Sequence, residues 1–259
     1  MSLHHDRSEF SGYDPIGSLA SARTVAPIVL RHLKPLTILD VGCGTGAWVR
    51  AYQDAGASYV VGVDGDCVRP EQLLFNPSRF HALDVSGVFR LPRQFDLVQC
   101  LEIAAHLPPS CSEALVDNLV AHGPVVMFSS APRGQGGENH INERPYEYWR
   151  DLFAARGYGL FDFLRPAIRF RQRVEPWYRY NLLVFVHDNA VDSLEPAVAA
   201  TRVKPGDRVP EWAPAAWRMR RRILSVLPTS LVSRMASAEH RMKLRKHAQL
   251  AEAERVEPT

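Results

Sequence analysis

From about residue 16 to residue 188, short apolar runs alternate with stretches in which apolar residues recur at helical spacing. The apolar runs have the length of buried strands; they cover 37–41, 59–63, 79–83, 95–101, 125–128, 159–164 and 181–186. The helical pattern covers 16–32, 47–55, 110–121 (with Ser110 as the expected N-cap) and 144–156. This alternation predicts an α/β fold, a doubly wound and mostly parallel seven-stranded sheet covered by helices on both faces.

Beyond residue 188 the pattern changes. Residues 190–214 contain four prolines and read as a loop, and residues 215–227 return to helical spacing. In that helix the apolar positions form one stripe, and a second stripe follows it; they are Ala216, Met219, Ile223 and Val226, then Leu231, Met235, Ala238 and Met242. We therefore expect a domain over 1–188, with a helical cover at 1–34 and a core at 35–188, followed by a loop and a basic amphipathic helical extension at 189–259.

Composition supports a globular protein, with 46% hydrophobic and 23% charged residues. No apolar run is long enough to span a bilayer, the first residues lack the apolar region of a signal peptide, and the four cysteines form no C-x-x-C pair. These features predict a cytoplasmic protein without a metal site or a disulfide framework. The oligomeric state is left open.

The net charge of +3 is unevenly distributed. Residues 201–259 hold 13 Lys and Arg against 6 Asp and Glu, a balance of +7, so the rest of the chain carries −4. A basic amphipathic helix can contact its own domain, a partner or an anionic surface such as a membrane or nucleic acid. We favour docking on its own domain, with the apolar stripe inward and the charged face in water.

A strand that runs into alternate glycines and then a helix is the most informative motif, Leu39-Asp-Val-Gly-Cys-Gly-Thr-Gly46. Glycines let the backbone pass close to a ligand, and the helix start offers unpaired N–H groups. Asp40 can face a ligand cation, Asp64 ends the next strand and can accept from both ribose hydroxyls, and Asp84 can accept from an adenine amine. Because carboxyl ends of parallel strands share one edge, the carboxylates predict a pocket for an adenosine with a cationic arm.

These residues, with the segment Phe95-Asp-Leu-Val-Gln-Cys-Leu-Glu-Ile-Ala-Ala-His-Leu107, resemble the motif series of class I S-adenosylmethionine-dependent methyltransferases of the small-molecule type. The resemblance covers about residues 16–188 and implies S-adenosylmethionine as cofactor. It assigns the methionine arm to the loop from Asp40 through Gly42, Gly44 and Gly46, and its amine to backbone near Leu101 and Glu102. It assigns the ribose to Asp64 beside Gly65, and the adenine to Asp84 with Val85.

An oxygen acceptor usually needs a general base with a pKa near neutral, which histidine supplies. The candidates are His106, after the fourth strand, and His140, in a polar glycine-rich segment after the fifth strand that could act as a lid. The same region offers residues that could contact the acceptor, namely Asn142, Glu143, Tyr146 and Trp149. The sequence lacks the Asn/Asp-Pro-Pro-Tyr tetrapeptide of base-amine methylation, a Pro-Cys pair for cytosine methylation, and the acidic cluster with Asp-Asn of metal-assisted catechol methylation. These absences favour O-methylation of a small molecule, either a specialised metabolite or a sugar, and leave N-methylation open.

Two alternatives remain. Gly42-x-Gly44-x-x-Ala47 also satisfies the dinucleotide pattern, so an NAD-dependent oxidoreductase of similar topology is the first. However, a pyrophosphate at that helix gains nothing from Asp40 beside it. The second alternative is a non-catalytic cofactor-binding protein that acts through a partner.

Overall fold

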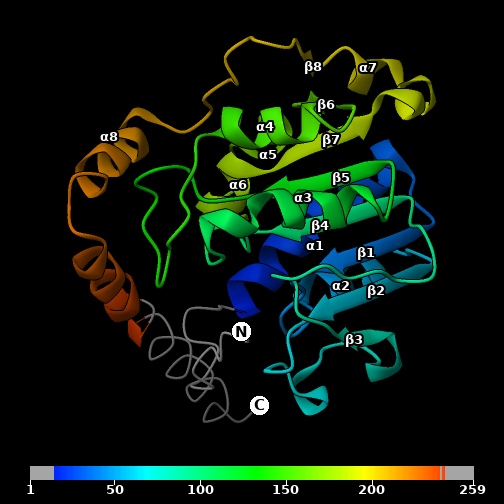
Figure 1. The fold of residues 1–259 in the computed structure, drawn as a ribbon, viewed down its shortest axis with the longest axis horizontal. Helices are drawn as coiled ribbons and strands as arrows, with labels where there is room; N and C mark the ends of the chain where they lie inside the picture. Colours follow the sequence, from blue (N-terminus) through cyan, green and yellow to red (C-terminus); the bar gives the residue numbers. More distant parts are fainter. Residues whose placement is uncertain (1–14, 240, 243–259) are drawn as a thin grey trace, which may run out of the picture.

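The computed structural model describes residues 15–239, 241 and 242 of the 259-residue chain. One sheet runs through the molecule in the order β3-β2-β1-β4-β5-β7-β6-β8 (Figure 1). The pairs from β3 to β5 are parallel, and the pairs that involve β7, β6 and β8 are antiparallel. The strands are β1 (Thr37–Val41), β2 (Tyr59–Asp64), β3 (Phe80–Ala82), β4 (Leu97–Leu101), β5 (Val125–Ser129), β6 (Tyr158–Phe161), β7 (Leu183–His187) and β8 (Arg202–Val203).

Helices cover both faces of this sheet, with α1 and α2 on one face and α3 and α4 on the other (Figure 1). The side chains of β1 alternate between the two faces of the sheet. Ile38 packs toward α1 and α2, while Leu39 and Val41 pack toward α3 and α4. The helices are α1 (Pro15–Leu33), α2 (Ala47–Asp54), α3 (Ser112–Val120), α4 (Tyr146–Ala154), α5 (Leu164–Ile168), α6 (Pro176–Asn181), α7 (Pro196–Ala199) and α8 (Ala215–Leu224).

The predicted α/β fold is confirmed, and every expected strand is present, with its ends shifted in all but β1. An eighth strand, β8, adds to the expected seven, so the sheet continues past the expected domain boundary at residue 188. Ser110 was expected to cap a helix but lies inside a short 3₁₀ helix, Pro109–Cys111, that leads into α3. Two consecutive prolines before it favour this tighter turn, so the expected cap is wrong.

The extension contacts its own domain, but not through the expected face. Helix α8 docks through Trp217, which packs against Tyr180, through Arg220, which donates to the Gln135 carbonyl, and through Leu224, which is buried. The expected inward stripe faces solvent: Met219 and Ile223 are 56% exposed and Val226 is 80% exposed. A guanidinium bond and an aromatic contact fix the helix instead of apolar burial, so the expected orientation is wrong.

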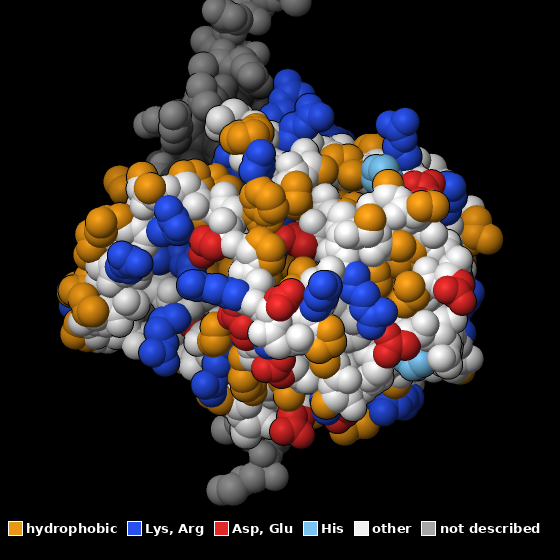
Figure 2. All heavy atoms as spheres, turned by 90° about the horizontal axis from the view of Figure 1, so that it is seen from above, with side chains coloured by type: hydrophobic (Ala, Val, Ile, Leu, Met, Phe, Trp, Pro, Cys, Tyr) orange, Lys and Arg blue, Asp and Glu red, His pale blue; other side chains and the backbone are white. Residues whose placement is uncertain are grey.

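A second helical stretch covers 229–239, where Leu231 and Met235 are also exposed. Figure 2 shows Lys and Arg side chains gathered on the side of the molecule that the extension forms, beside exposed apolar side chains. Residues 1–14 of the expected helical cover, and the basic residues after 242, lie outside the described residues. In the described part of the chain, no helix has both the length and the hydropathy that crossing a bilayer requires.

Candidate active site

The glycine-rich turn joins β1 to α2 at the carboxyl edge of the sheet. Gly42, Gly44 and Gly46 have φ values of 77°, 54° and 84°, a left-handed conformation that side-chain-bearing residues rarely adopt. A Cβ on Gly42 would overlap the Ile103 side chain, and one on Gly46 would overlap the Phe75 ring. Gly42 and Gly46 are therefore required both by the left-handed backbone conformation and by the close packing of neighbouring side chains.

Asp40 lies under α2 with 2% of its surface exposed. Its Oδ1 accepts a hydrogen bond from Gln99 Nε2 at 2.9 Å, and Gln99 in turn accepts from Tyr52 at 2.9 Å. Its Oδ2 is buried and has no hydrogen-bond partner among the described residues. Burial raises the pKa of Asp40 to about 7, although the bond from Gln99 opposes the shift. A cation brought to the free oxygen would therefore stabilise the ionised form.

Asp64 ends β2 and faces the glycine turn. One of its oxygens accepts from Gly44 N at 2.6 Å and the other from Gly65 N at 2.7 Å. Burial raises the pKa of this carboxyl group, and the two backbone bonds oppose the shift. A carboxylate has about four acceptor positions, so Asp64 can still accept from two further hydroxyls.

The remaining cofactor candidates lie along the same edge. Asp84 is exposed and follows β3, where its Oδ1 accepts from the backbone and side chain of Ser86 at 2.9 and 2.6 Å. Val85 packs partly against the core beneath it. Leu101 is the last residue of β4 and is 7% exposed. The structure thus places these residues at the tips of neighbouring strands, as the sequence predicted.

Glu102 belongs to a hydrogen-bond network that the sequence motif alone does not reveal. It follows β4 with φ of 59°, and its carboxylate accepts from Gln135 Nε2 at 2.8 Å and from Asn181 Nδ2 at 3.2 Å. Asn181 also donates to Gln135 Oε1 at 2.7 Å. Burial raises the pKa of Glu102, and the hydrogen bonds from Gln135, Ser129 and Asn181 oppose the rise. This network links β4, the segment after β5 and α6, and Gln135 and Asn181 had no sequence signal because no motif brings them together.

The expected lid segment, residues 133–143, folds back against the loop after β4. Ile141 N and Asn142 N both donate to the Ala105 carbonyl, at 2.9 and 3.0 Å. His140 Nδ1 lies 3.1 Å from Glu143 Oε1, and only 11% of the His140 side chain is exposed. The His106 ring meets the His140 ring edge-on, with centroids 4.9 Å apart. The two histidine candidates therefore lie side by side.

Glu143 holds the lid segment together. Besides His140, its carboxylate accepts from Gly134 N at 2.6 Å and from Gly136 N at 2.8 Å. Burial would raise its pKa, but the bonds from His140, Gly136 and Gly134 keep the pKa of Glu143 below its usual value. Glu143 is thus an ionised group that holds His140 in place. The sequence pattern predicts a contact between Glu143 and the acceptor instead.

Three further acceptor candidates are interior residues in this structure, so their contact with an acceptor stays a prediction. Trp149 is 1% exposed and packs against Phe128. Tyr146 is 6% exposed and donates to Tyr180 O and Asn181 Oδ1. Asn142 is 2% exposed and donates to Ala104 O and Ser112 Oγ. Helical spacing of aromatic residues is equally typical of core packing, and Tyr146 and Trp149 pack in the core here.

A family model described as a methyltransferase domain matches residues 16–164. The chain belongs to this methyltransferase family. The family uses S-adenosylmethionine, which confirms the cofactor expected from the sequence and sets aside the nicotinamide alternative. The match covers β1 to β6, the lid segment and α4, and it ends at Leu164, the first residue of α5.

Curated relatives include two methyltransferases of different names. The chain is 27% identical over 158 residues to the ubiquinone biosynthesis O-methyltransferase of Neisseria meningitidis, covering 55% of this chain and 62% of the relative. It is 31% identical over 140 residues to the tRNA U34 carboxymethyltransferase of Proteus mirabilis, covering 48% of this chain and 42% of the relative. The chain therefore spans less than two thirds of the length of either methyltransferase.

Among solved structures, the chain is similar to magnesium protoporphyrin IX methyltransferase from Synechocystis PCC 6803 with bound SAM. The identity is 19% and the TM-score 0.48, and the similarity covers 67% of this chain and 81% of that chain.

The residues at the carboxyl edge fit the cofactor of this methyltransferase family. Buried polar atoms that lack a partner within the described residues gather there: Asp40 Oδ2, Thr45 Oγ1 in the glycine turn and Ser130 Oγ just after β5. Buried polar groups are nearly always hydrogen-bonded, so such atoms at one edge indicate a polar ligand. Asp40 is suited to the ammonium of the methionine arm and Asp64 to ribose hydroxyls. The sequence alone does not single out Thr45 and Ser130, because isolated hydroxyl residues carry no pattern.

Proposed function

We propose that the chain transfers a methyl group from S-adenosylmethionine to an oxygen of a small-molecule acceptor, a specialised metabolite or a sugar. The observation that carries the oxygen acceptor is the His140–Glu143 pair, with its 3.1 Å contact, on the segment that leaves the carboxyl end of β5. Proton removal from a hydroxyl is the step that such a pair serves. The name of the ubiquinone biosynthesis O-methyltransferase relative supports the same chemistry.

S-adenosylmethionine supplies the activated methyl group when it is bound. Asp40 pairs with its ammonium, Asp64 and Gly65 hold its ribose, and Asp84 with Val85 borders its adenine. Backbone groups at Leu101 and Glu102 complete the methionine end. These residues orient the donor, and alignment of the reacting groups is the main contribution that such an enzyme makes.

His140 accepts the proton of the acceptor hydroxyl at Nε2, while Glu143 holds the Nδ1 proton and stabilises the imidazolium that forms. Glu143 can do so because two other donors, Gly134 N and Gly136 N, already help to keep its carboxylate ionised. His106, edge-on to His140, lines the same side of the site. Acceptor entry requires the lid segment to open, since the His140 ring lies against the Gly137 backbone.

Replacement of His140 by alanine tests the base. We expect methyl transfer to fall about 100-fold or more, a typical loss for a general base, while calorimetric affinity for S-adenosylmethionine stays unchanged. The assay incubates protein with methyl-labelled cofactor and a cell extract, and mass spectrometry identifies the product that gains CH₂. The extract is separated into small molecules and RNA, because one relative is named for tRNA.

A matched control is His32→Ala. His32 also lies 3.1 Å from a glutamate, Glu195, but at the end of α1 and away from the carboxyl edge. Transfer should be retained in this variant. Equal losses in both variants, or label in RNA only, would contradict the proposal. Cofactor binding with no product from any fraction would instead favour the non-catalytic alternative.

Asp64→Ala tests the cofactor site separately. Loss of a buried acceptor for two hydroxyls should weaken S-adenosylmethionine binding more than tenfold, since each bond to a charged group contributes about 1.5–3 kcal/mol. Isothermal titration calorimetry measures the affinity, and circular dichroism checks the fold. An unchanged affinity would mean that the ribose lies elsewhere.

A further inference from the structure

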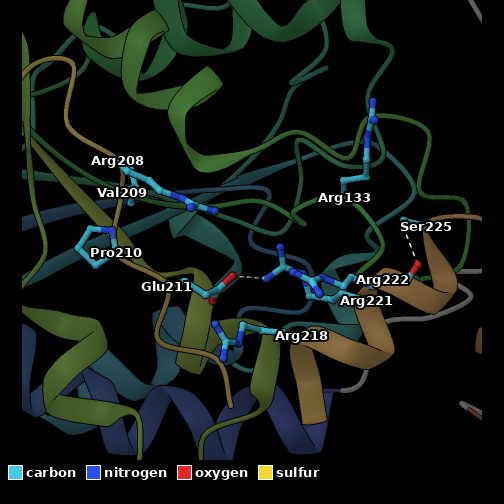
Figure 3. A pocket seen from close by; sticks show the side chains of 9 residues that line it. All are labelled: Arg133, Arg208, Val209, Pro210, Glu211, Arg218, Arg221, Arg222 and Ser225. Carbon is cyan, nitrogen blue, oxygen red and sulfur yellow. Dashed lines mark hydrogen bonds and ion pairs between the residues drawn. The ribbon is translucent and has the colours of Figure 1, made fainter. Parts of the chain in front are cut away.

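A basic cavity lies outside the cofactor edge, between α8, the segment 208–211 and the start of the lid segment. Its volume is about 460 Å³, and five arginines and one carboxylate contribute most of its polar lining: Arg133, Arg208, Arg218, Arg221, Arg222 and Glu211. We call it the arginine pocket. Figure 3 shows Arg208 and Arg221 reaching into it from opposite walls, while the guanidinium of Arg133 turns outward at the rim.

The positive charge in this pocket is largely uncompensated. Glu211 pairs with Arg221 at 2.8 Å, and the Nε of Arg221 is buried without a partner among the described residues. In the part of the chain that the structure describes, the side chains of Arg133, Arg208, Arg218 and Arg222 make no ion pair. Guanidinium groups stay charged at any physiological pH, so five of them around one cavity give a positive potential that attracts an anion.

The walls of the pocket are fixed before any ligand binds. Val209 N donates to Glu147 Oε1 of α4 at 3.0 Å, and Trp212 Nε1 donates to Asp162 at 2.8 Å. On the opposite wall Arg220 donates to the Gln135 carbonyl at 2.8 Å. At 100° per residue, the docking residues of α8 occupy one face, and Arg218, Arg221 and Arg222 occupy a second face that points into the cavity. The segments that carry the arginines are therefore held in place, while the side chains of Arg133, Arg208, Arg218 and Arg222 are exposed to a ligand from solution.

The residue type indicates the ligand. All five cations are arginine, and the planar guanidinium donates paired hydrogen bonds that match a phosphate. A carboxylate would be satisfied by one or two of them, whereas a phosphate dianion or a diphosphate can engage several at once. The volume is sufficient for such a group.

The pocket adjoins the segment that carries the proposed base. Arg133 begins the lid segment, and its neighbour Gly134 donates to Glu143, the partner of His140. The Arg221 carbonyl of α8 lies directly against Gly134. An anionic group bound in the pocket would therefore lie beside the start of the segment that holds His140.

We propose that the arginine pocket binds the phosphoryl group of the methyl acceptor, which is a phosphate or diphosphate ester. The identification of the ligand as a methyl acceptor rests on the proposed methyltransferase function, whereas binding of the anion does not depend on it. The ester has two possible sources, a soluble metabolite or a lipid carrier, because exposed Met219, Ile223 and Val226 occupy the third face of α8 beside the pocket.

The first test titrates pyrophosphate into the full chain by calorimetry. The wild type should bind saturably, with an affinity that falls as salt rises, and Arg218→Gln with Arg222→Gln should weaken binding at least about tenfold. The control, Arg31→Gln with Arg173→Gln, removes the same charge from exposed positions outside the pocket and should change the affinity less than about twofold. Absence of saturable binding, or equal loss in the control, overturns the proposal.

S-adenosylmethionine affinity is measured on the same proteins and should be equal in all three. Wild-type protein that binds the cofactor but not pyrophosphate defeats this inference alone. Protein that binds pyrophosphate but not the cofactor defeats the proposed function, and with it the identification of the ester as an acceptor.

The second test treats the small-molecule extract with phosphodiesterase and alkaline phosphatase before the methyl-transfer assay. Loss of the labelled product supports a phosphorylated acceptor, and an unchanged product overturns it. Uridine diphosphate and phosphatidylcholine vesicles containing phosphatidic acid then separate the sources. Binding of the nucleotide alone assigns a soluble ester, and vesicle sedimentation that pyrophosphate competes away assigns a lipid. Failure of both probes counts against the pocket.

Discussion

Asp40 lies almost fully buried at the end of β1, with one oxygen bonded to Gln99 and the other without a partner in the described chain. Its position could be predicted because a strand tip followed by alternate glycines fixes where the carboxylate lies. The raised pKa of Asp40 could not be predicted from the sequence, since its burial depends on α2, Tyr52 and Gln99, which only the fold brings together. The same limit hid Ser130, Gln135 and Asn181.

The raised pKa of Asp40 makes stability depend on pH. Folding raises it from 3.8 to about 7, so between these values the folded chain holds a proton that the unfolded chain has lost. The free energy of unfolding therefore falls as pH rises through this window, by at most about 1.4 kcal/mol per unit. Asp40→Asn keeps an acceptor for Gln99 but does not titrate.

We expect Asp40→Asn to match the wild type near pH 4 and to become progressively more stable than it toward pH 7. Chemical denaturation at a series of pH values measures the difference, which should level off above pH 7. Stability curves that run parallel for the two proteins would show that Asp40 is ionised in the fold at all these pH values. Cofactor affinity should fall in the same variant.

At the scale of elements, the strands were predictable because each is a compact apolar run bounded by turn residues. β8 was missed because two residues, Arg202 and Val203, carry no periodicity. The face of α8 was assigned wrongly because apolar spacing was taken to mark the docking side. In the structure a close backbone approach at Gly134 and polar bonds to the lid segment decide the orientation, and these depend on residues about 85 positions away in sequence.

Gly134→Ala should release α8 from the lid segment. Its Cβ would overlap the Arg221 carbonyl, and its φ of 78° is unfavourable for alanine. Hydrogen exchange should rise across residues 215–224, and Glu143 should lose its bond from Gly134 N. Gly206→Ala is the control, because Gly206 has φ of 84° but nothing within 4 Å of the added Cβ. Similar exchange in both variants would attribute the effect to backbone strain alone.

At the scale of the whole molecule, a buried ion pair beside the sheet also binds a tryptophan from the segment before α8. Arg165 is fully buried and binds both oxygens of Asp162, at 2.8 and 2.7 Å, and Trp212 donates to the same carboxylate at 2.8 Å. Asp162→Ala leaves a buried guanidinium without its partner. We expect the free energy of unfolding to fall by about 3–5 kcal/mol.

Denaturant unfolding of Asp162→Ala against Asp188→Ala checks this expectation. Asp188 pairs with Arg202 at 2.7 Å, but both side chains are more than 40% exposed, so its loss should cost less than about 1 kcal/mol. Comparable losses in the two variants would mean that water reaches Arg165. A large loss only in Asp162→Ala would confirm that the Asp162–Arg165 pair is buried away from water.

Strand β8 has a consequence for any shortened form of the protein. It pairs with β6 at only two positions, Leu160 with Val203 and Phe161 with Arg202, yet it covers the outer edge of an apolar strand. Proteolytic trimming at residue 188 would uncover that edge and leave backbone donors and acceptors free to capture a strand from another molecule. A fragment cut there would tend to aggregate, whereas one that retains residues 202–203 would keep Leu160 and Phe161 of β6 paired.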